Sequence, residues 1–291
     1  MDVWACGRMD DWIPEPRPHV HTFNHPYQKK MCFIVLAYER HPRYRFVLAT
    51  NRDEFYARPT APAAYWSDAP HLLAGRDLQG GGTWLGLTRT GRLAALTNYR
   101  EPGVTLPNAP TRGALVADYL TGTQDPRAYL EDVSRRADRY HGFNLLVGDT
   151  EGLYYFGNRA SGIRVLEPGL YGLSNHLLDT PWPKIVRGKA ALAAALDADA
   201  VDPETLFRFL TDARHAPDEA LPDTGVGLDW ERLLSPIFIE SPAYGTRVST
   251  VVLVDHQGHV TFAERAYASK ANGEPPVTRR FDFEMEVEKV P

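Results

Sequence analysis

The sequence predicts an α+β fold in which antiparallel sheets are layered with helices. Apolar runs of strand length come in pairs joined by short turns, which is typical of β-hairpins. The helical patterns gather in a central stretch and in a later pair. They do not alternate with single strands as in a parallel doubly wound sheet. We find no internal repeat, low-complexity segment or linker, and therefore expect one domain over residues 31–291, preceded by an extension over residues 1–30.

The strand patterns are rich in Val, Ile, Leu and Phe, and turn residues separate them. Glycine or proline marks the turns at His41-Pro42-Arg43, Thr90-Gly91, Thr150-Glu151-Gly152 and Gln257-Gly258. We expect loops at Arg58–Pro62 and Gly80–Gly82. The expected strands, in chain order, are Cys32–Glu39, Arg45–Asn51, Thr83–Leu87, Arg92–Asn98, Phe143–Val147, Leu153–Phe156, Leu170–Asn175, Val248–Val254, Val260–Glu264 and Arg279–Val287.

Four helices are expected between these strands. Thr111 is a candidate N-cap for a helix over Arg112–Leu120. Asp125 is a candidate N-cap for the next helix, with Pro126 at its first position, where proline is well tolerated. Pro183–Leu196, which is rich in alanine, and Pro203–Ala213 form the later pair.

Composition excludes several classes of protein. The net charge of −5 gives neither a basic surface for nucleic acid nor a polybasic segment for an anionic membrane. No apolar run approaches the ~20 residues of a transmembrane helix. The two cysteines, Cys6 and Cys32, are too few for a secreted disulfide scaffold, although one bridge between them is conceivable. Residues 1–30 lack the apolar core of a signal peptide, so we interpret them as a propeptide or an upstream start, and expect a cytoplasmic protein.

The Met31-Cys32 pair opens the first apolar strand and is the most informative feature of the sequence. A cysteine in such a strand is commonly a small core residue. Its place at the start of the ordered pattern favours a second interpretation. If the chain began at Cys32, one residue would carry both a thiol and a free α-amine. A nucleophile and its base would then be joined, as N-terminal-nucleophile catalysis requires.

Polar residues at other strand ends are candidates for the same site, and each also has a structural interpretation. Asp53, in Asn51-Arg52-Asp53-Glu54, could hold a protonated amine, and Arg52 could favour a thiolate. Alternatively, this segment is a polar strand end with salt bridges. Asn98 and Asn175 are oxyanion donors or turn residues. Arg247 is a site residue or an exposed arginine at a strand start. Gly80–Gly82 lacks phosphate-loop spacing, and no metal-ligand pattern occurs.

These segments together resemble the NRDE family, whose animal members are called transport and Golgi organisation protein 2 homologues. The resemblance covers residues 31–287 and begins at the Met-Cys pair. It rests on motifs that occur in order along the chain. They are Met31-Cys32, Asn51–Phe55, Gly81–Gly86, Leu93–Tyr99, Gly142–Leu145, Tyr171–Asn175 and Tyr244–Arg247.

The NRDE family in turn is similar to N-terminal-nucleophile hydrolases of the choloylglycine hydrolase and penicillin V acylase branch. That resemblance implies a four-layer αββα sandwich of antiparallel sheets and no cofactor. It assigns the nucleophile to Cys32, the amine contact to Asp53, the oxyanion hole to Asn98 and Asn175, and the arginine near the thiol to Arg247 or Arg52. We also expect substrate contacts from Arg52, Trp84 and Tyr99.

The preferred interpretation is a cysteine hydrolase for a small linear amide or acyl substrate, a C–N hydrolase outside the peptidases. The alternative is a non-catalytic carrier or trafficking protein on the same fold. The resemblance suggests this alternative because family members have been tied to haem and lipid handling and to secretion and Golgi organisation. Fold alone does not decide between the two. A carrier would tolerate the loss of Cys32, and a hydrolase would not.

Overall fold

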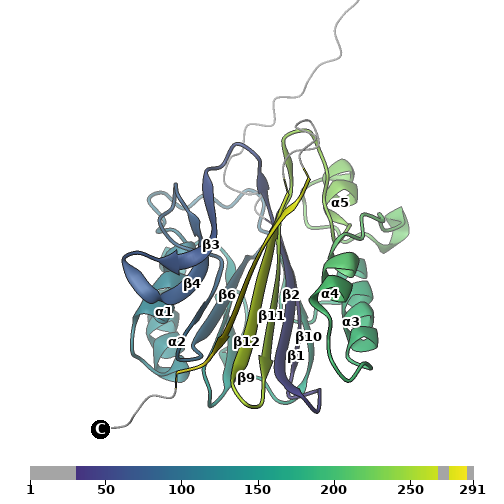
Figure 1. The fold of residues 1–291 in the computed structure, drawn as a ribbon. Helices are drawn as coiled ribbons and strands as arrows, with labels where there is room; N and C mark the ends of the chain where they lie inside the picture. The colour runs from purple at the N-terminus through teal and green to yellow at the C-terminus, as the bar shows by residue number, and fades with distance from the viewer. Residues whose placement is uncertain (1–30, 268–274, 287–291) are drawn as a thin grey trace, which may run out of the picture.

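Two antiparallel sheets form the centre of the molecule in the computed structural model, which describes residues 31–267 and 275–286 (Figure 1). The strands of the first sheet lie in the order β10-β1-β2-β11-β12-β13. Their bounds are Met31–Tyr38 for β1, Tyr44–Phe55 for β2, Gly169–Leu173 for β10, Tyr244–Asp255 for β11, His259–Ala266 for β12 and Val277–Glu284 for β13.

The second sheet has the strand order β3-β4-β5-β6-β7-β8-β9, so each pair of neighbouring strands is also consecutive in the chain. Consecutive antiparallel strands need only short connections, as the hairpin patterns predict. Their bounds are Thr60–Trp66 for β3, Ala69–Asp77 for β4, Leu85–Thr88 for β5, Leu93–Asn98 for β6, Phe143–Gly148 for β7, Leu153–Gly157 for β8 and Ile163–Val165 for β9.

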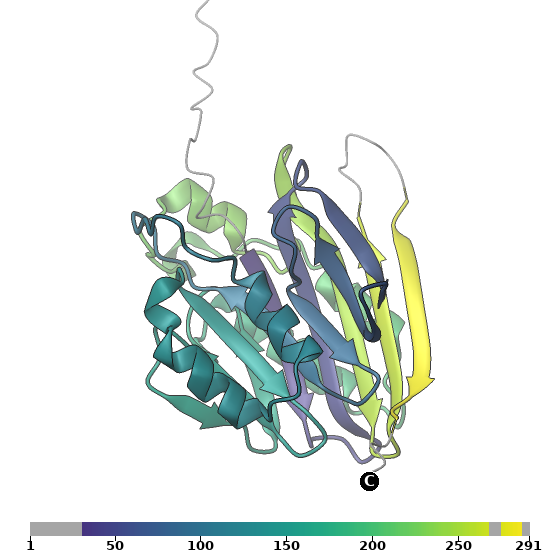
Figure 2. The same ribbon diagram turned by 90° about the vertical axis from the view of Figure 1, so that its left-hand side faces the viewer.

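Helices cover the outer face of each sheet, and Figure 2 shows α1 and α2 in front of the second sheet. The α-helices are α1 (Gly113–Thr121), α2 (Pro126–Arg135), α3 (Pro183–Ala195), α4 (Pro203–Leu210) and α5 (Leu228–Leu234), with short 3₁₀ turns at Ala137–Arg139 and Asp218–Ala220. None of the helices in the described part of the chain is long and apolar enough to cross a membrane.

Three buried apolar clusters define the layers. One lies between the two sheets, one between the second sheet and α1 and α2, and one between the first sheet and α3 and α4. Strand β1 contributes to two of these clusters, because its side chains point alternately to the two faces of the first sheet. Ile34 and Leu36 belong to the cluster between the sheets, whereas Phe33 and Val35 belong to the cluster on the helix side. A strand covered on both faces reads as a continuous apolar run. The αββα sandwich is therefore confirmed.

The structure corrects several expected elements. The expected loop at Arg58–Pro62 enters strand β3, because β3 is an edge strand, where proline costs no ladder hydrogen bond. Strands β4 and β9 and helix α5 were not expected at all. Thr111 is not the N-cap of α1, since Arg112 holds that position without a side-chain cap. Asp125 does cap α2, accepting from the Ala128 amide at 2.9 Å.

Smaller corrections concern where elements begin and end. Strand β10 ends before Ser174, helix α4 ends at Leu210, and strand β11 begins four residues before Val248. The end of the expected strand at Val287, Cys6 and the extension over residues 1–30 all lie outside the described residues.

The glycine run before β5 gives a stability prediction. A Cβ on Gly82 would lie 2.4 Å from the backbone oxygen of Gly113, at the start of α1. The backbone of Gly113 cannot move aside from the new methyl group as a flexible side chain could. We therefore expect Gly82→Ala to lower the free energy of unfolding by roughly 1–3 kcal/mol. Gly80→Ala is the matched control, because the nearest atom to its Cβ would be a side-chain oxygen at 3.3 Å. Urea unfolding of both variants checks this, and equal losses would contradict it.

Candidate active site

Strand pairing places several candidate residues at one end of the first sheet. In the β1–β2 ladder residue 31 lies opposite Asp53, and Cys32 lies opposite Arg52. In the β2–β11 ladder Thr246 also lies opposite Asp53. The register shifts between Thr246 and Val248, so Arg247 sits at a bulge in the same end of the sheet. A bulge redirects one side chain relative to the regular ladder.

Cys32 carries a free thiol, and its side chain is only 7% exposed. Because side chains alternate along a strand, Cys32 shares the face of Ile34 between the sheets. Burial raises the pKa of the Cys32 thiol to about 12, helped by the charge of Asp53 and opposed by that of Arg52. With residue 31 attached, the thiol therefore has the electrostatic environment of an unreactive cysteine.

Asp53 points to the other face of the strand, toward the helices. Its Oδ1 accepts a hydrogen bond from the Thr246 hydroxyl at 2.6 Å. Its Oδ2 is buried and has no hydrogen-bond partner among the described residues. Burial raises the pKa of Asp53 to about 6, although Lys184, the Thr246 hydrogen bond and Arg52 all favour the carboxylate. An acceptor of this kind is costly to leave unpaired, so it marks a place where a donor can bind.

Hydrogen bonds connect the two asparagines to Cys32. Ser174 is the residue after β10. Its hydroxyl is the donor toward two oxygens, the Cys32 carbonyl at 3.0 Å and Asn175 Oδ1 at 3.2 Å. Asn175 is fully buried, and its Nδ2 donates to the Asn98 carbonyl at 2.8 Å. Asn98 is half-buried at the end of β6. The structure thus brings Asn98, Asn175 and Cys32 together from different sheets.

The two arginines differ in what they contact. The Arg52 guanidinium carbon lies 4.5 Å from the centre of the Trp84 ring, and Arg52 Nη1 is buried without a hydrogen-bond partner within the described ranges. Arg247 Nη1 instead donates to three carbonyl oxygens of the turn after β2, at Phe55, Tyr56 and Arg58. Of the two expected arginines, Arg52 therefore has the closer relation to the thiol, and Arg247 anchors a turn.

Of the expected substrate contacts, Trp84 is buried beside Arg52, whereas Tyr99 is half-buried against His176, with ring centres 5.0 Å apart. Tyr99 directly follows Asn98, so it lies at the same end of the second sheet.

Lys184 belongs to this site and was missed in the sequence. Its side chain is only 2% exposed, and its Nζ donates to the Leu234 carbonyl at 3.0 Å. Burial lowers the pKa of Lys184 to about 8, against the opposing effect of Asp53. A signal existed, since Lys184, Gly188 and Leu192 form one buried stripe of α3 at helical spacing. A charged residue on such a stripe indicates a special environment.

Glu264 is a buried carboxyl between the sheets and gives a pH prediction. Its Oε1 accepts from the Ala63 amide at 2.7 Å. Burial raises the pKa of Glu264 from 4.5 to about 7, opposed by that hydrogen bond. Since the folded pKa is the higher one, the stabilisation is complete below about pH 4.5 and disappears as pH rises through 7. The difference between the ordinary pKa of 4.5 and the folded pKa of about 7 corresponds to roughly 3 kcal/mol in the free energy of unfolding.

We therefore expect the free energy of unfolding to fall between pH 4.5 and 8 in the wild type and to stay flatter in Glu264→Gln. Denaturant titrations at several pH values measure this. Glu219→Gln is the control, because Glu219 is exposed and should retain the wild-type slope. A wild-type slope in Glu264→Gln would contradict the prediction.

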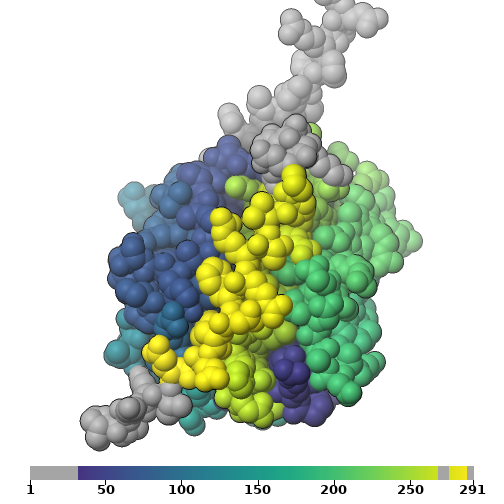
Figure 3. Space-filling view, viewed as in Figure 1, coloured from purple at the N-terminus to yellow at the C-terminus, as the bar shows by residue number. Residues whose placement is uncertain are grey.

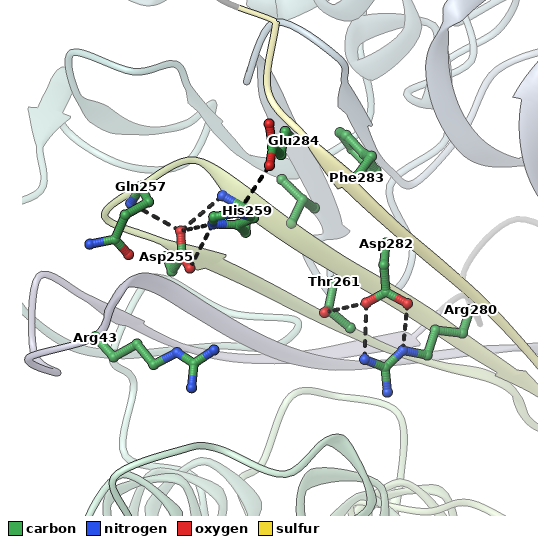
Figure 4. Close-up of a pocket in the computed structure, with 10 residues that line it drawn as sticks. Arg43, Asp255, Gln257, His259, Thr261, Arg280, Asp282, Phe283 and Glu284 are labelled. Atoms are coloured by element: carbon green, nitrogen blue, oxygen red, sulfur yellow. Dashed lines mark hydrogen bonds and ion pairs between the residues drawn. The ribbon is translucent and has the colours of Figure 1, made fainter.

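A second, separate feature is an open groove of about 770 Å³ on the face shown in Figure 3. It lies at the far end of the first sheet from Cys32, beside Arg43 and the β11–β12 turn (Figure 4). Its charged side chains are largely paired, with His259 between Asp255 and Glu284 at 3.1 and 3.2 Å. Across the described residues, no group of three or more His, Cys, Asp and Glu residues is arranged to hold a metal ion.

A family model for Transport and Golgi organisation 2 matches residues 31–269. The chain belongs to this family. The mouse transport and Golgi organization 2 homolog is 38% identical over 261 residues, which cover 82% of this chain and 94% of the mouse protein. The bovine homolog is 41% identical over 257 residues, covering 81% and 93%. The resemblance to this family, drawn from the ordered motifs between Met31 and Arg247, is thus confirmed.

Among solved structures, a Caenorhabditis elegans N-acylethanolamine-hydrolyzing acid amidase ortholog is similar with a TM-score of 0.45 and 12% identity, covering 76% of this chain and 92% of the other. The Transport and Golgi organisation 2 match begins at residue 31 and includes every candidate residue named above.

Proposed function

We propose that this chain is a cysteine N-terminal-nucleophile hydrolase that acts on a small linear amide or related acyl substrate. The observation that carries the proposal is the buried Oδ2 of Asp53, which lacks a hydrogen-bond partner in the described part of the chain. Residue 31 lies opposite Asp53 in the ladder. If the chain is cut between residues 31 and 32, the new α-amine of Cys32 emerges beside this carboxylate.

The freed amine supplies the base that the buried thiol lacks. In the uncut chain the nitrogen of Cys32 is an amide and cannot accept a proton, and the pKa of the thiol is about 12. In the cut chain the amine takes the proton from Sγ, and the thiolate attacks the carbonyl carbon of the substrate. Arg52, opposite Cys32 in the ladder, favours the thiolate.

Asn98 and Asn175 then serve as the oxyanion donors. Hydrogen bonds support this role: the Ser174 hydroxyl contacts both the Cys32 carbonyl and Asn175 Oδ1, and Asn175 Nδ2 donates to the Asn98 carbonyl. Collapse of the tetrahedral intermediate breaks the bond to the leaving group, which takes the proton held by the α-amine. Water hydrolyses the acyl-enzyme and restores the thiol. In this proposal the reaction needs no cofactor and takes place in the cytoplasm.

Acyl capture on Cys32 tests the proposal. A recognition site for a sequence-specific protease is introduced so that the site ends at residue 31. The full chain can then fold before it is cut immediately before Cys32. The cut chain is mixed with a panel of activated acyl amides and thioesters, and intact mass follows the acyl group on Cys32 and its loss to water. The cut chain should be acylated, and Cys32→Ala should not. Equal labelling of both would reject the proposal.

The buried thiol itself favours a second candidate function. A cysteine whose pKa is raised by burial is typically inert, which suits a carrier or trafficking protein that binds a lipid or haem without catalysis. The two candidates differ in the cell. Cys32→Ala should abolish the biological activity of a hydrolase, whereas a carrier should keep it.

A further inference from the structure

Lys184 is a lysine enclosed by protein at the base of the candidate site. It lies in the first turn of α3, and within residues 31–267 and 275–286 its side chain makes one hydrogen bond, to the backbone carbonyl of Leu234 at the end of α5. Taking an ammonium out of water costs several kcal/mol unless other groups compensate. A leucine or methionine would fill this position without that cost, so the charge needs a reason.

The surroundings of Lys184 supply one. Asp53 and Cys32 are among the groups that favour its ammonium form, together with Glu231, while Arg100 opposes it. Among the described residues, Lys184 and Asp53 are both buried but form no direct ion pair or hydrogen bond with each other. Asp53 Oδ1 accepts a hydrogen bond from Thr246, and Asp53 Oδ2 has no hydrogen-bond partner in that part of the chain. Lys184 thus acts on Asp53 through space and leaves its Oδ2 open.

We propose that Lys184 is a positioning residue for the N-terminal amine of Cys32, a role that rests on the proposed hydrolase function. Its charge keeps Asp53 ionised, so that Asp53 can accept a hydrogen bond from the amine. The same charge disfavours a second cation beside Asp53, so the amine stays neutral and can act as a base. Lys184 exchanges no proton in the reaction: the S–H bond of Cys32 breaks and an N–H bond forms on its own amine.

The pH dependence of thiol alkylation tests this inference. In the cut full chain, iodoacetamide labelling of Cys32 is followed by intact mass from about pH 5 to pH 10. Lys184→Met keeps the length of the side chain and removes the charge, so the midpoint should rise by about one pH unit, which is a tenfold lower rate below the midpoint. Lys184→Arg keeps the charge and should restore the wild-type midpoint.

Two comparisons separate the amine from other effects. Lys189→Met on the same helix is the matched control, because Lys189 is half-buried, pairs with Asp179 at 2.7 Å and should leave the midpoint unchanged. The uncut chain, with Cys6→Ser so that Cys32 is its one remaining cysteine, has no α-amine at Cys32. Lys184→Met should therefore shift the labelling profile of the uncut chain less than that of the cut chain. Equal shifts in cut and uncut chains, or a lower melting temperature with an unchanged midpoint, would overturn the inference.

A wild-type measurement covers the case in which Lys184→Met does not fold. The Lys184 charge disfavours the ammonium form of the α-amine and should therefore lower the pKa of that amine itself. Nitrogen NMR of the ¹⁵N-cysteine-labelled cut chain should give the Cys32 amine a midpoint below the ordinary ~7.7–8.0, and a midpoint at or above that range would reject the inference. Neither experiment measures turnover. If Lys184 affects the Cys32 amine as expected but no acyl group is transferred to Cys32, the hydrolase proposal is rejected and the positioning role of Lys184 is not.

Discussion

Cutting the full chain immediately before Cys32 should speed the alkylation of its thiol by iodoacetamide roughly a hundredfold near pH 7. In the uncut chain the thiol has a pKa of about 12 because it is buried. An adjacent amine with a pKa of ~7.7–8.0 that brings the thiol to its ordinary ~8.5 raises the thiolate fraction about 10³-fold. The less basic thiolate is a weaker nucleophile, with a Brønsted coefficient of ~0.4–0.5, which removes about half of the gain on a logarithmic scale.

The measurement is the rate of mass gain in matched cut and uncut samples. Both samples carry Cys6→Ser, because Cys6 would otherwise be alkylated in the uncut chain. In this background Cys32→Ser is the control for labelling elsewhere, and it should gain no mass in either form. Asp53→Asn should lose most of the acceleration, because Asp53 is the buried acceptor that orients the amine. An uncut chain that reacts as fast as the cut one would show that the thiol needs no amine, and the N-terminal-nucleophile mechanism would be wrong.

Local patterns predicted most of the fold because most of its strands pair with their neighbours in the chain. The β1–β2 hairpin is an example: two apolar runs and a turn at His41-Pro42-Arg43 fix a register that sets Cys32 opposite Arg52. The same hairpin makes the nearness of Cys32 and Asp53 predictable from sequence. Strand β3 was missed because Pro59 and Pro62, just before and within it, indicate a loop, and nothing local shows that it is an edge strand.

Helix α5 was missed for a different reason. It spans only Leu228–Leu234, which is too short to show a period, and it begins after Gly227 with a φ of 87°. A buried ion pair holds it in place, since Glu231 Oε2 lies 2.5 Å from Nη1 of Arg100, in the chain after β6. Such a partner is far away in sequence, so no window of local pattern contains it.

The candidate site shows the same difference between residues placed by local pairing and residues placed by long-range contacts. The places of Asn175 and Arg247 were expected from motif order in the family resemblance, because their neighbours come from distant strands. Lys184 was overlooked because a lysine in a helix usually faces water. Only the packing of α3 on the first sheet shows that Lys184 is buried on the side of the sheet to which Asp53 points. Long-range contacts of this kind are what sequence patterns do not carry.

Asn98→Ala should lower the turnover of the cut chain by about 10²–10³-fold, or roughly 3–4 kcal/mol of transition-state stabilisation, once a substrate is found. The physical reason is the charge that develops on the substrate oxygen, which the side-chain amide N–H of Asn98 stabilises in the proposed mechanism. The Asn98 carbonyl, which accepts from Asn175 Nδ2 at 2.8 Å, belongs to the backbone and remains in the variant. The melting temperature should therefore change little.

Asn158→Ala is the control that separates the two kinds of asparagine. The Asn158 side chain accepts from the Phe143 amide at 2.8 Å and donates to the carbonyls of Ala137 and Tyr140 at 3.1 and 3.2 Å, so it holds a turn together. Its loss should cost roughly 1–3 kcal/mol of stability and leave turnover nearly intact. Steady-state rates and thermal melts of the two variants should thus show opposite patterns. If Asn98→Ala behaves like Asn158→Ala, Asn98 is a structural residue and the oxyanion hole must be built from other donors.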